Sequence, residues 1–134
     1  MMEITVPAIR ENVEKVSSFI NEFLEENDCP MKVQVHIDIA VDEIFSNVAF
    51  YAYENGGDIT VQISIKEDPR RAVISFIDEG IKYNPLEKEE PDVTLSANER
   101  EIGGLGIFIV KKSMDSMVYE RVNEKNILTI EKNM

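Results

Sequence analysis

At 134 residues the chain is long enough for one domain with one buried core, and its 43% apolar and 30% charged residues are typical of a soluble globular protein. Its formal charge of −12 at pH 7 argues against general binding to nucleic acid or anionic membranes, because phosphate contacts need clustered Lys and Arg. If the chain binds a polyphosphate, it must do so with backbone amides, a metal ion and a few placed cations.

The sequence shows no recognisable signal for membrane insertion or export. No apolar run is long enough to cross a bilayer, and the N-terminus lacks the basic and apolar regions of a signal peptide. The single cysteine, Cys29, has no partner for an internal disulfide. Together these features predict a cytoplasmic protein.

The first part of the chain predicts one strand and two helices. Residues 3–6 alternate polar and apolar and predict a short edge strand that Pro7 ends. Residues 8–24 predict an amphipathic helix, and a second helix follows Pro30 and continues to about residue 53. The predicted buried stripe of the first helix is Ile9, Val13, Val16, Phe19, Ile20, Phe23 and Leu24. That of the second is Val33, Ile37, Ala40, Val41, Ile44, Val48 and Ala52.

Two hairpins are predicted further along the chain. Residues 59–65 alternate strictly, and residues 72–77 form their return strand across a turn. Residues 117–122 and 127–130 predict a last hairpin.

Between the two hairpins lie an irregular segment and a third helix. Residues 80–102 have no periodicity and carry prolines and many charges, which is typical of a functional lid. A helix is then predicted over residues 105–114. This order predicts an α+β fold over residues 1–134: a two-layer sandwich with a mixed, mostly antiparallel sheet, helices on one face, and a lid at about residues 80–104.

A glycine cluster precedes the third helix. Gly103, Gly104 and Gly106 occupy three of four positions, with Leu105 between them. Backbone without a Cβ approaches a ligand closely, and a helix that begins here aims unpaired N–H groups at an anion. A flexible turn before a core helix would leave the same pattern, so the cluster alone is a weak signal.

Glu43 and Asn47 lie four residues apart and therefore on one face of the second helix. Most pairs of this kind are solvated surface residues. In a functional site, the Asn amide oxygen would be a magnesium ligand beside substrate phosphates, and the Glu would accept a proton from an attacking hydroxyl or water.

Asp78 ends a predicted strand and is followed by Gly80. One interpretation is a strand-ending turn, in which Asp-x-Gly is common. The other is a carboxylate at the mouth of a pocket that accepts a hydrogen bond from the exocyclic amine of a purine, with Gly80 leaving room for the base. The motif alone is compatible with both.

Taken together, Glu43-x-x-x-Asn47, Asp78-x-Gly80, a long lid and Gly103-Gly104-x-Gly106 resemble the ATP-binding domain shared by gyrase, histidine kinases and MutL. The short length, the helix before the first motif and the residues around the glycine cluster resemble most closely the anti-sigma-factor serine/threonine kinases of bacterial stress and sporulation control. The resemblance covers essentially the whole chain.

The resemblance implies a role for each motif. Glu43 would be the general base, Asn47 would bind Mg²⁺, and Asp78 would contact the adenine of ATP, with Gly80 lining its pocket. Residues 103–106, which are Gly103, Gly104, Leu105 and Gly106, would bring backbone amides to the phosphates. The family transfers phosphate to a Ser or Thr of an antagonist protein, sequesters a sigma factor and forms homodimers.

Two departures from the family pattern bear on this implied activity. Phe50 and Tyr51 stand where many relatives carry a His, and Lys125 and Asn126 stand near a Gly and a Thr that contact adenine in relatives. We do not carry that role over to Thr129. The alternatives are a nucleotide-gated protein-binding module with little phosphotransfer and an α+β interaction domain that binds no nucleotide.

Overall fold

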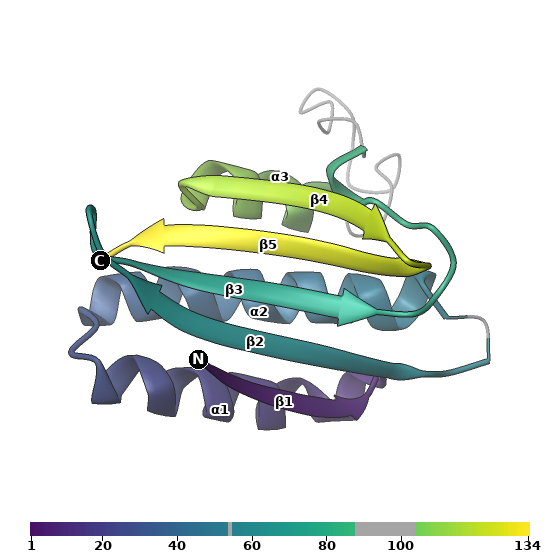
Figure 1. Cartoon of the computed structure of the whole chain (residues 1–134), viewed down its shortest axis with the longest axis horizontal. Helices are drawn as coiled ribbons and strands as arrows, with labels where there is room; N and C mark the ends of the chain where they lie inside the picture. Colours follow the sequence, from purple (N-terminus) through teal and green to yellow (C-terminus); the bar gives the residue numbers. More distant parts are fainter. Residues whose placement is uncertain (54, 88–103) are drawn as a thin grey trace.

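The computed structural model describes residues 1–53, 55–87 and 104–134 (Figure 1). These residues form five strands, three α-helices and two short 3-10 helices. In chain order the elements are β1 (Met2–Pro7), η1 (Arg10–Asn12), α1 (Val13–Glu26), α2 (Met31–Tyr51), β2 (Asp58–Lys66), β3 (Arg71–Asp78), η2 (Pro85–Glu87), α3 (Gly104–Ser113), β4 (Ser116–Val122) and β5 (Lys125–Asn133).

The five strands form one sheet in the order β1-β2-β3-β5-β4, and all four neighbouring pairs are antiparallel. β5 therefore lies between β3 and β4 and pairs with a strand that is distant in sequence. Both predicted hairpins are confirmed. The parallel pairing that a mixed sheet would contain does not occur among these five strands.

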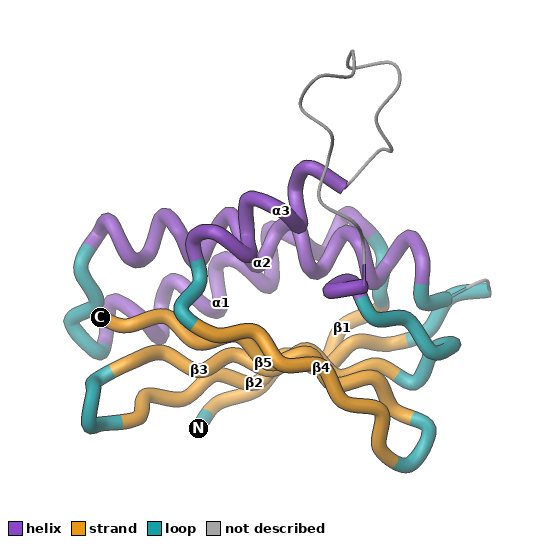
Figure 2. Tube along the Cα trace, turned by 90° about the horizontal axis from the view of Figure 1, so that it is seen from above, coloured by secondary structure: helices purple, strands orange, loops and turns teal. Residues whose placement is uncertain are grey.

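The three α-helices cover one face of the sheet, so the fold has two layers (Figure 2). α2 packs against both α1 and α3 and is the central helix of its layer. The α+β two-layer architecture expected from the sequence is confirmed. The core lies between the layers, and its largest fully buried side chains include Phe45, Phe76, Ile20, Leu24, Ile37, Ile44, Ile59, Ile63, Ile74, Ile107 and Ile130.

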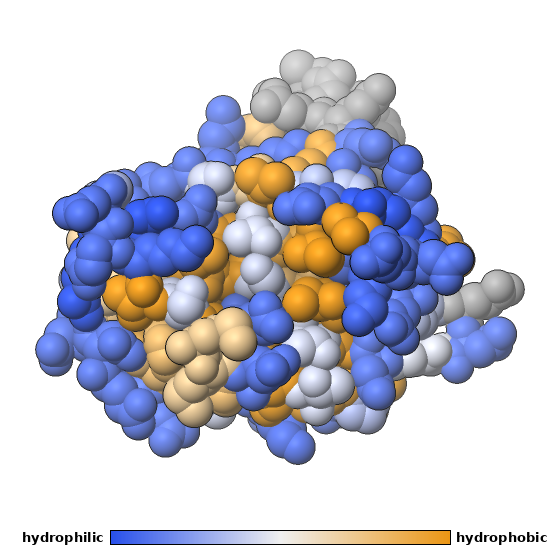
Figure 3. Space-filling model, viewed as in Figure 1, coloured by the Kyte–Doolittle hydropathy of each residue, from blue (hydrophilic) through white to orange (hydrophobic). Residues whose placement is uncertain are grey.

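The opposite face of the sheet mixes polar residues with apolar patches (Figure 3). Ser75 and Thr129 pair across β3 and β5 on this face, with 2.8 Å between their hydroxyl oxygens. Thr129 alternates with the buried Leu128 and Ile130, so its side chain points away from the helices. A Thr129 contact with a ligand on the helix side of the sheet is therefore excluded in this structure.

The first helix begins later than predicted. Residues 8–12 are not α-helical, α1 starts at Val13, and Ile9 is 48% exposed instead of buried. Ile9 has extended backbone, and the amide of Asn12 donates to the carbonyl of Pro7 at 2.8 Å, which holds residues 7–12 in a tight turn. This local side-chain bond competes with helix formation.

Among residues 1–53, 55–87 and 104–134, none of the helices has the length and apolar character of a membrane-spanning helix.

Candidate functional site

Glu43 and Asn47 lie one turn apart on α2, at the edge of a groove of about 600 Å³. Asn47 is only 4% exposed, and its Nδ2 donates to the backbone carbonyl of Glu43 at 2.6 Å. Its Oδ1 accepts a hydrogen bond from the hydroxyl of Tyr83 at 3.1 Å. Because the amide nitrogen is held by the helix, the amide oxygen is the atom that Asn47 presents to neighbouring groups.

The side chain of Glu43 reaches from α2 to the first turn of α3. A Cβ added to Gly106 would collide with the Glu43 carboxylate, so this carboxylate lies directly against the Gly106 backbone. α3 begins at Gly104, and the N–H groups of its first turn have no partner within the helix. The structure thus brings Glu43 and Gly106, which the sequence separates by a long segment, to one place beside Asn47.

The groove beside Glu43 and Asn47 has mixed chemistry. Its lining comes from residues 8–11, including Arg10, and from the part of α2 between Asp42 and Tyr51. Phe50 on this helix is 77% exposed, and its ring contacts Tyr51 edge to face at a centroid distance of 4.8 Å. The ring of Tyr51 in turn contacts the ring of Tyr83 in a tilted arrangement, with 5.2 Å between the ring centroids. An aromatic cluster therefore joins the groove to the residues that follow β3.

Asp78 is the last residue of β3 and continues its buried face, with only 3% of its surface exposed. Its Oδ1 accepts hydrogen bonds from the backbone N–H of Gly80 at 2.9 Å and from Nδ2 of Asn126 at 2.8 Å. Burial raises the pKa of the Asp78 carboxyl, and the bonds from Asn126 and Gly80 and the charge of Arg121 partly oppose this rise. The Asp-x-Gly segment is therefore a strand-ending turn whose carboxylate is buried.

Gly80 is required by packing against the end of α2. A Cβ at this position would collide with the backbone carbonyl of Ala52, and the next N–H, that of Ile81, donates to this carbonyl at 2.9 Å. The bond satisfies a carbonyl near the end of α2. The expected role of Gly80 in lining a base pocket remains a prediction.

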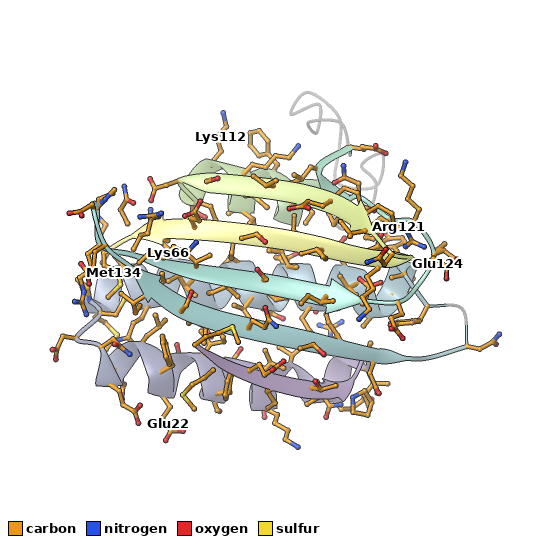
Figure 4. All side chains as sticks on the ribbon, viewed as in Figure 1. Glu22, Lys66, Lys112, Arg121, Glu124 and Met134 are labelled. Atoms are coloured by element: carbon orange, nitrogen blue, oxygen red, sulfur yellow. The ribbon has the colours of Figure 1, made fainter. Side chains whose placement is uncertain are left out.

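Three polar residues around Asp78 were not predicted as site residues. Strand register places Asn126 opposite Asp78, and Arg121 opposite Asn126. Nη1 of Arg121 donates to the carbonyl of Gly80 at 2.9 Å, and Arg121 lies at the end of the sheet where β3 ends and β5 begins (Figure 4). The third is Tyr83. The available sequence signal was the spacing of Asn126, two and four residues before the apolar Leu128 and Ile130, since this places all three on the helix-facing side.

Tyr83 connects the two groups of predicted site residues. Its backbone N–H donates to Oδ1 of Asn126 at 3.3 Å, and its hydroxyl donates to Oδ1 of Asn47. The groups around Asp78 and around Glu43 thus belong to one continuous network.

Some of the predicted site lies outside the described residues. Gly103 and the part of the predicted lid that spans residues 88–103 are among these, and only the backbone of Gly104 and Leu105 is described. The part of the lid that is described includes η2, where Nζ of Lys111 donates to the carbonyl of Leu86 at 3.0 Å. This contact holds η2 against α3.

The sheet is antiparallel with a buried Asp at a strand end, and the Glu43 carboxylate of the central helix lies against a glycine-led helix. These features agree with the class of histidine-kinase-like ATPase domains. The family model described as "Histidine kinase-like ATPase domain" matches residues 6–132, and the chain belongs to this family.

Two named relatives match this chain, one over nearly its whole length and the other over about three quarters of it. It is 28% identical over 131 residues to the anti-sigma F factor of Clostridium acetobutylicum, covering 98% of this chain and 91% of that protein. It is 21% identical over 99 residues to the serine/threonine-protein kinase BtrW of Bordetella bronchiseptica, covering 74% of this chain and 70% of that protein.

Among solved structures, the histidine kinase domain of the Erythrobacter litoralis EL346 blue-light activated histidine kinase has the same fold. The TM-score is 0.53 at 14% identity, and the match covers 96% of this chain. This chain spans about three fifths of that structure (61%), so the similarity concerns its fold.

Proposed function

We propose that this protein is an ATP-dependent serine/threonine protein kinase that acts as an anti-sigma regulatory factor. The observation that carries the proposal is the contact of the Glu43 carboxylate with Gly106 at the start of α3, one helical turn from Asn47. This arrangement joins a proton acceptor, an oxygen ligand and backbone N–H groups that have no partner within their own helix. The family of the chain and the names of its relatives support the proposal.

Glu43 is the general base of the proposed reaction. It accepts the proton of a Ser or Thr hydroxyl on the antagonist protein as that oxygen attacks the terminal phosphate of ATP. The substrate phosphates are bound by backbone N–H groups at the start of α3, from Gly104, Leu105 and Gly106, with Gly103 preceding them. Backbone donors suit a chain of net charge −12, since they provide positive potential without added cations.

Asn47 is the proposed protein ligand of Mg²⁺. An amide oxygen is a ligand that Mg²⁺ takes, and the orientation of this one is fixed by the bond from Nδ2 to the helix and the bond that Oδ1 accepts from Tyr83. Among the residues that the structure describes, no cluster of three or more His, Cys, Asp or Glu side chains could hold a metal ion. An ion at Asn47 would take phosphate oxygens and water as its other ligands, which is usual for Mg²⁺. When bound, Mg²⁺ supplies neutralisation of phosphate charge.

Asp78 is the proposed contact for the exocyclic amine of adenine, with Gly80 beside it. Both lie at the end of the sheet joined to Asn47 through Tyr83. ATP bound between these groups would have its base at Asp78 and its phosphates at α3.

The proposed partners are a small Ser- or Thr-bearing antagonist and a sigma factor, with the protein acting as a cytoplasmic homodimer. The names of the anti-sigma F factor relatives support the sigma factor, and the named kinase supports phosphotransfer.

A second function, a nucleotide-gated protein-binding module with little phosphotransfer, is favoured by one observation. Phe50 is highly exposed at the edge of the groove that contains Glu43. An exposed aromatic side chain beside a groove suits contact with a partner protein and requires no chemistry.

The test measures Mg-ATP affinity and single-turnover transfer to the antagonist encoded nearest the gene. Glu43→Gln keeps the shape of the side chain but not its proton acceptance, so ATP should still bind while transfer falls by ~10²–10⁴-fold. Asn47→Ala should weaken Mg-ATP binding itself along with transfer. Asp42→Asn is the matched control: Asp42 is the exposed neighbour of Glu43 and lines the same groove, so its loss of charge should change neither quantity much.

Two results contradict the kinase proposal. If the wild-type protein binds ATP but labels no partner, and Glu43→Gln changes nothing, the protein is the binding module. If the wild-type protein binds no ATP, both proposals are wrong.

A further inference from the structure

The amide of Asn126 lies at the centre of the polar network at the end of the sheet. Asn126 is 3% exposed. Its Nδ2 donates two hydrogen bonds, one to Oδ1 of Asp78 at 2.8 Å and one to the carbonyl of Ile81 at 2.7 Å. Both protons of this amide are therefore used.

The orientation of this amide follows from its other contacts. Oδ1 of Asn126 accepts from the backbone N–H of Tyr83 at 3.3 Å, from Nη1 of Arg121 at 3.1 Å and from the hydroxyl of Tyr119 at 2.5 Å. Rotating the amide by a half turn would set its nitrogen against the N–H of Tyr83 and the cation of Arg121, and its oxygen against Asp78. Asn126 is thus held as a donor toward Asp78.

The consequence for Asp78 is that its two oxygens differ. Oδ1 accepts hydrogen bonds from Nδ2 of Asn126 and from the backbone N–H of Gly80. Oδ2 accepts no hydrogen bond from the residues that the structure describes. A carboxylate fixed through one oxygen can offer the other in a defined direction.

We propose that Asn126 is the positioning residue that sets the base preference of this site. It holds Oδ1 of Asp78, so that Oδ2 is left to accept the 6-amine of a purine. The inference rests on the proposed binding of ATP. It predicts discrimination against a purine with a 6-oxo group, since an ionised carboxylate can accept from an amine but cannot donate to a carbonyl oxygen.

The ionisation of Asp78 provides a readout that separates positioning from simple stabilisation. Burial raises the pKa of Asp78, and the bond from Asn126 opposes this rise. The groups that face Asp78 from the neighbouring elements are Arg121 and Tyr119 on β4 and Tyr53 after α2, with Glu79 next in the chain. Loss of the Asn126 donor should raise the pKa of Asp78 further, so ATP binding should weaken at a higher pH than in the wild-type protein.

The experiment compares ATP with inosine triphosphate, which carries a 6-oxo group, by calorimetry from roughly pH 5 to roughly pH 8. The substitutions Asn126→Val and Asn126→Thr introduce side chains of nearly the same shape. Only Thr provides a hydrogen-bond donor, its hydroxyl, in place of the lost amide donor to Asp78. The Val variant should lose about ten-fold in ATP affinity at neutral pH and much of its preference for ATP. The Thr variant should recover part of both.

Thr129→Val is the matched control on the same strand. It removes the hydroxyl that pairs with Ser75 on the opposite face of the sheet, so affinity, base preference and pH midpoint should not change. If Asn126→Val does not fold, as judged by circular dichroism, Asn126→Ala and Asn126→Ser provide the same comparison with smaller side chains.

Equal losses of ATP and inosine triphosphate binding, with the pH midpoint unmoved, would show that Asn126 only stabilises the fold and would overturn this inference alone. Absence of ATP binding by the wild-type protein would overturn the proposed function and the inference with it.

Discussion

The contact between Gly106 and Glu43 predicts that stability and activity can be separated by one methyl group. Gly106→Ala places a Cβ where the Glu43 carboxylate now lies. The group in its way is the end of a flexible side chain, so Glu43 can withdraw without a backbone shift. The variant should therefore fold, with Glu43 displaced from the start of α3.

Two contributions to the free energy of unfolding of Gly106→Ala have opposite signs. Replacing Gly by Ala in a helix stabilises by up to about 1 kcal/mol, and forcing a Glu43 side-chain torsion about 30° away from its rotamer costs about 0.5–1.5 kcal/mol. The net change in the free energy of unfolding should thus lie within about 1 kcal/mol of zero. Displacing a catalytic group by about 1 Å can reduce the rate by about 10²-fold, and we expect a loss of that size in phosphotransfer.

The assay is a double-mutant cycle with Glu43→Ala, measured by urea unfolding and by single-turnover transfer. With the carboxylate removed, Gly106→Ala should stabilise by its full helix propensity, about 1 kcal/mol. Ile109→Ala, an exposed position on α3, controls for a general change in that helix and should leave transfer unchanged. A wild-type rate of phosphotransfer in Gly106→Ala would refute the reasoning. So would additive changes in the free energy of unfolding for Gly106→Ala and Glu43→Ala.

Two further predictions concern the end of the sheet. Gly80→Ala should destabilise the protein by more than about 2 kcal/mol, because its Cβ meets the Ala52 carbonyl, which is backbone and cannot turn away; a change below about 0.5 kcal/mol in urea unfolding would contradict this. Asp78→Asn should weaken ATP binding by about ten- to a hundred-fold in calorimetry without destabilising the ligand-free protein at neutral pH. The folded-state pKa of Asp78 is raised, so its contribution to stability falls as pH rises from about 3.8 through the folded-state value; thermal unfolding across this range should show that decline in the wild-type protein and not in Asp78→Asn.

Periodicity was sufficient to predict the layers of this fold. Each apolar pattern of period 3.6 or 2 became a helix or strand, because burying one face is what determines these elements. The exception at Ile9 arose where Asn12 bonds to the carbonyl of Pro7, a local polar contact that apolar spacing does not reveal.

The candidate site was predicted only in part, for a related reason. Glu43 and Asn47 lie four residues apart in one helix, and this spacing alone predicts that their side chains share a face of the helix. The contact of Asp78 with Asn126 depends on β5 entering the sheet beside β3, and local patterns do not specify this pairing. Tyr83 was missed since its role depends on contacts with both α2 and β5.

The insertion of β5 between β3 and β4 links the site to the cooperativity of unfolding. If β5 detaches, β4 loses its only partner in the described sheet, and Asp78 loses Asn126 in the same event. Asp78 and Asn126 both lie on inner strands, so fraying of an edge strand does not by itself break their contact at the proposed base-binding end of the site. A ligand bound at Asp78 should accordingly slow amide hydrogen exchange along β3 and β5 together, since its binding free energy is added to the opening of the whole sheet.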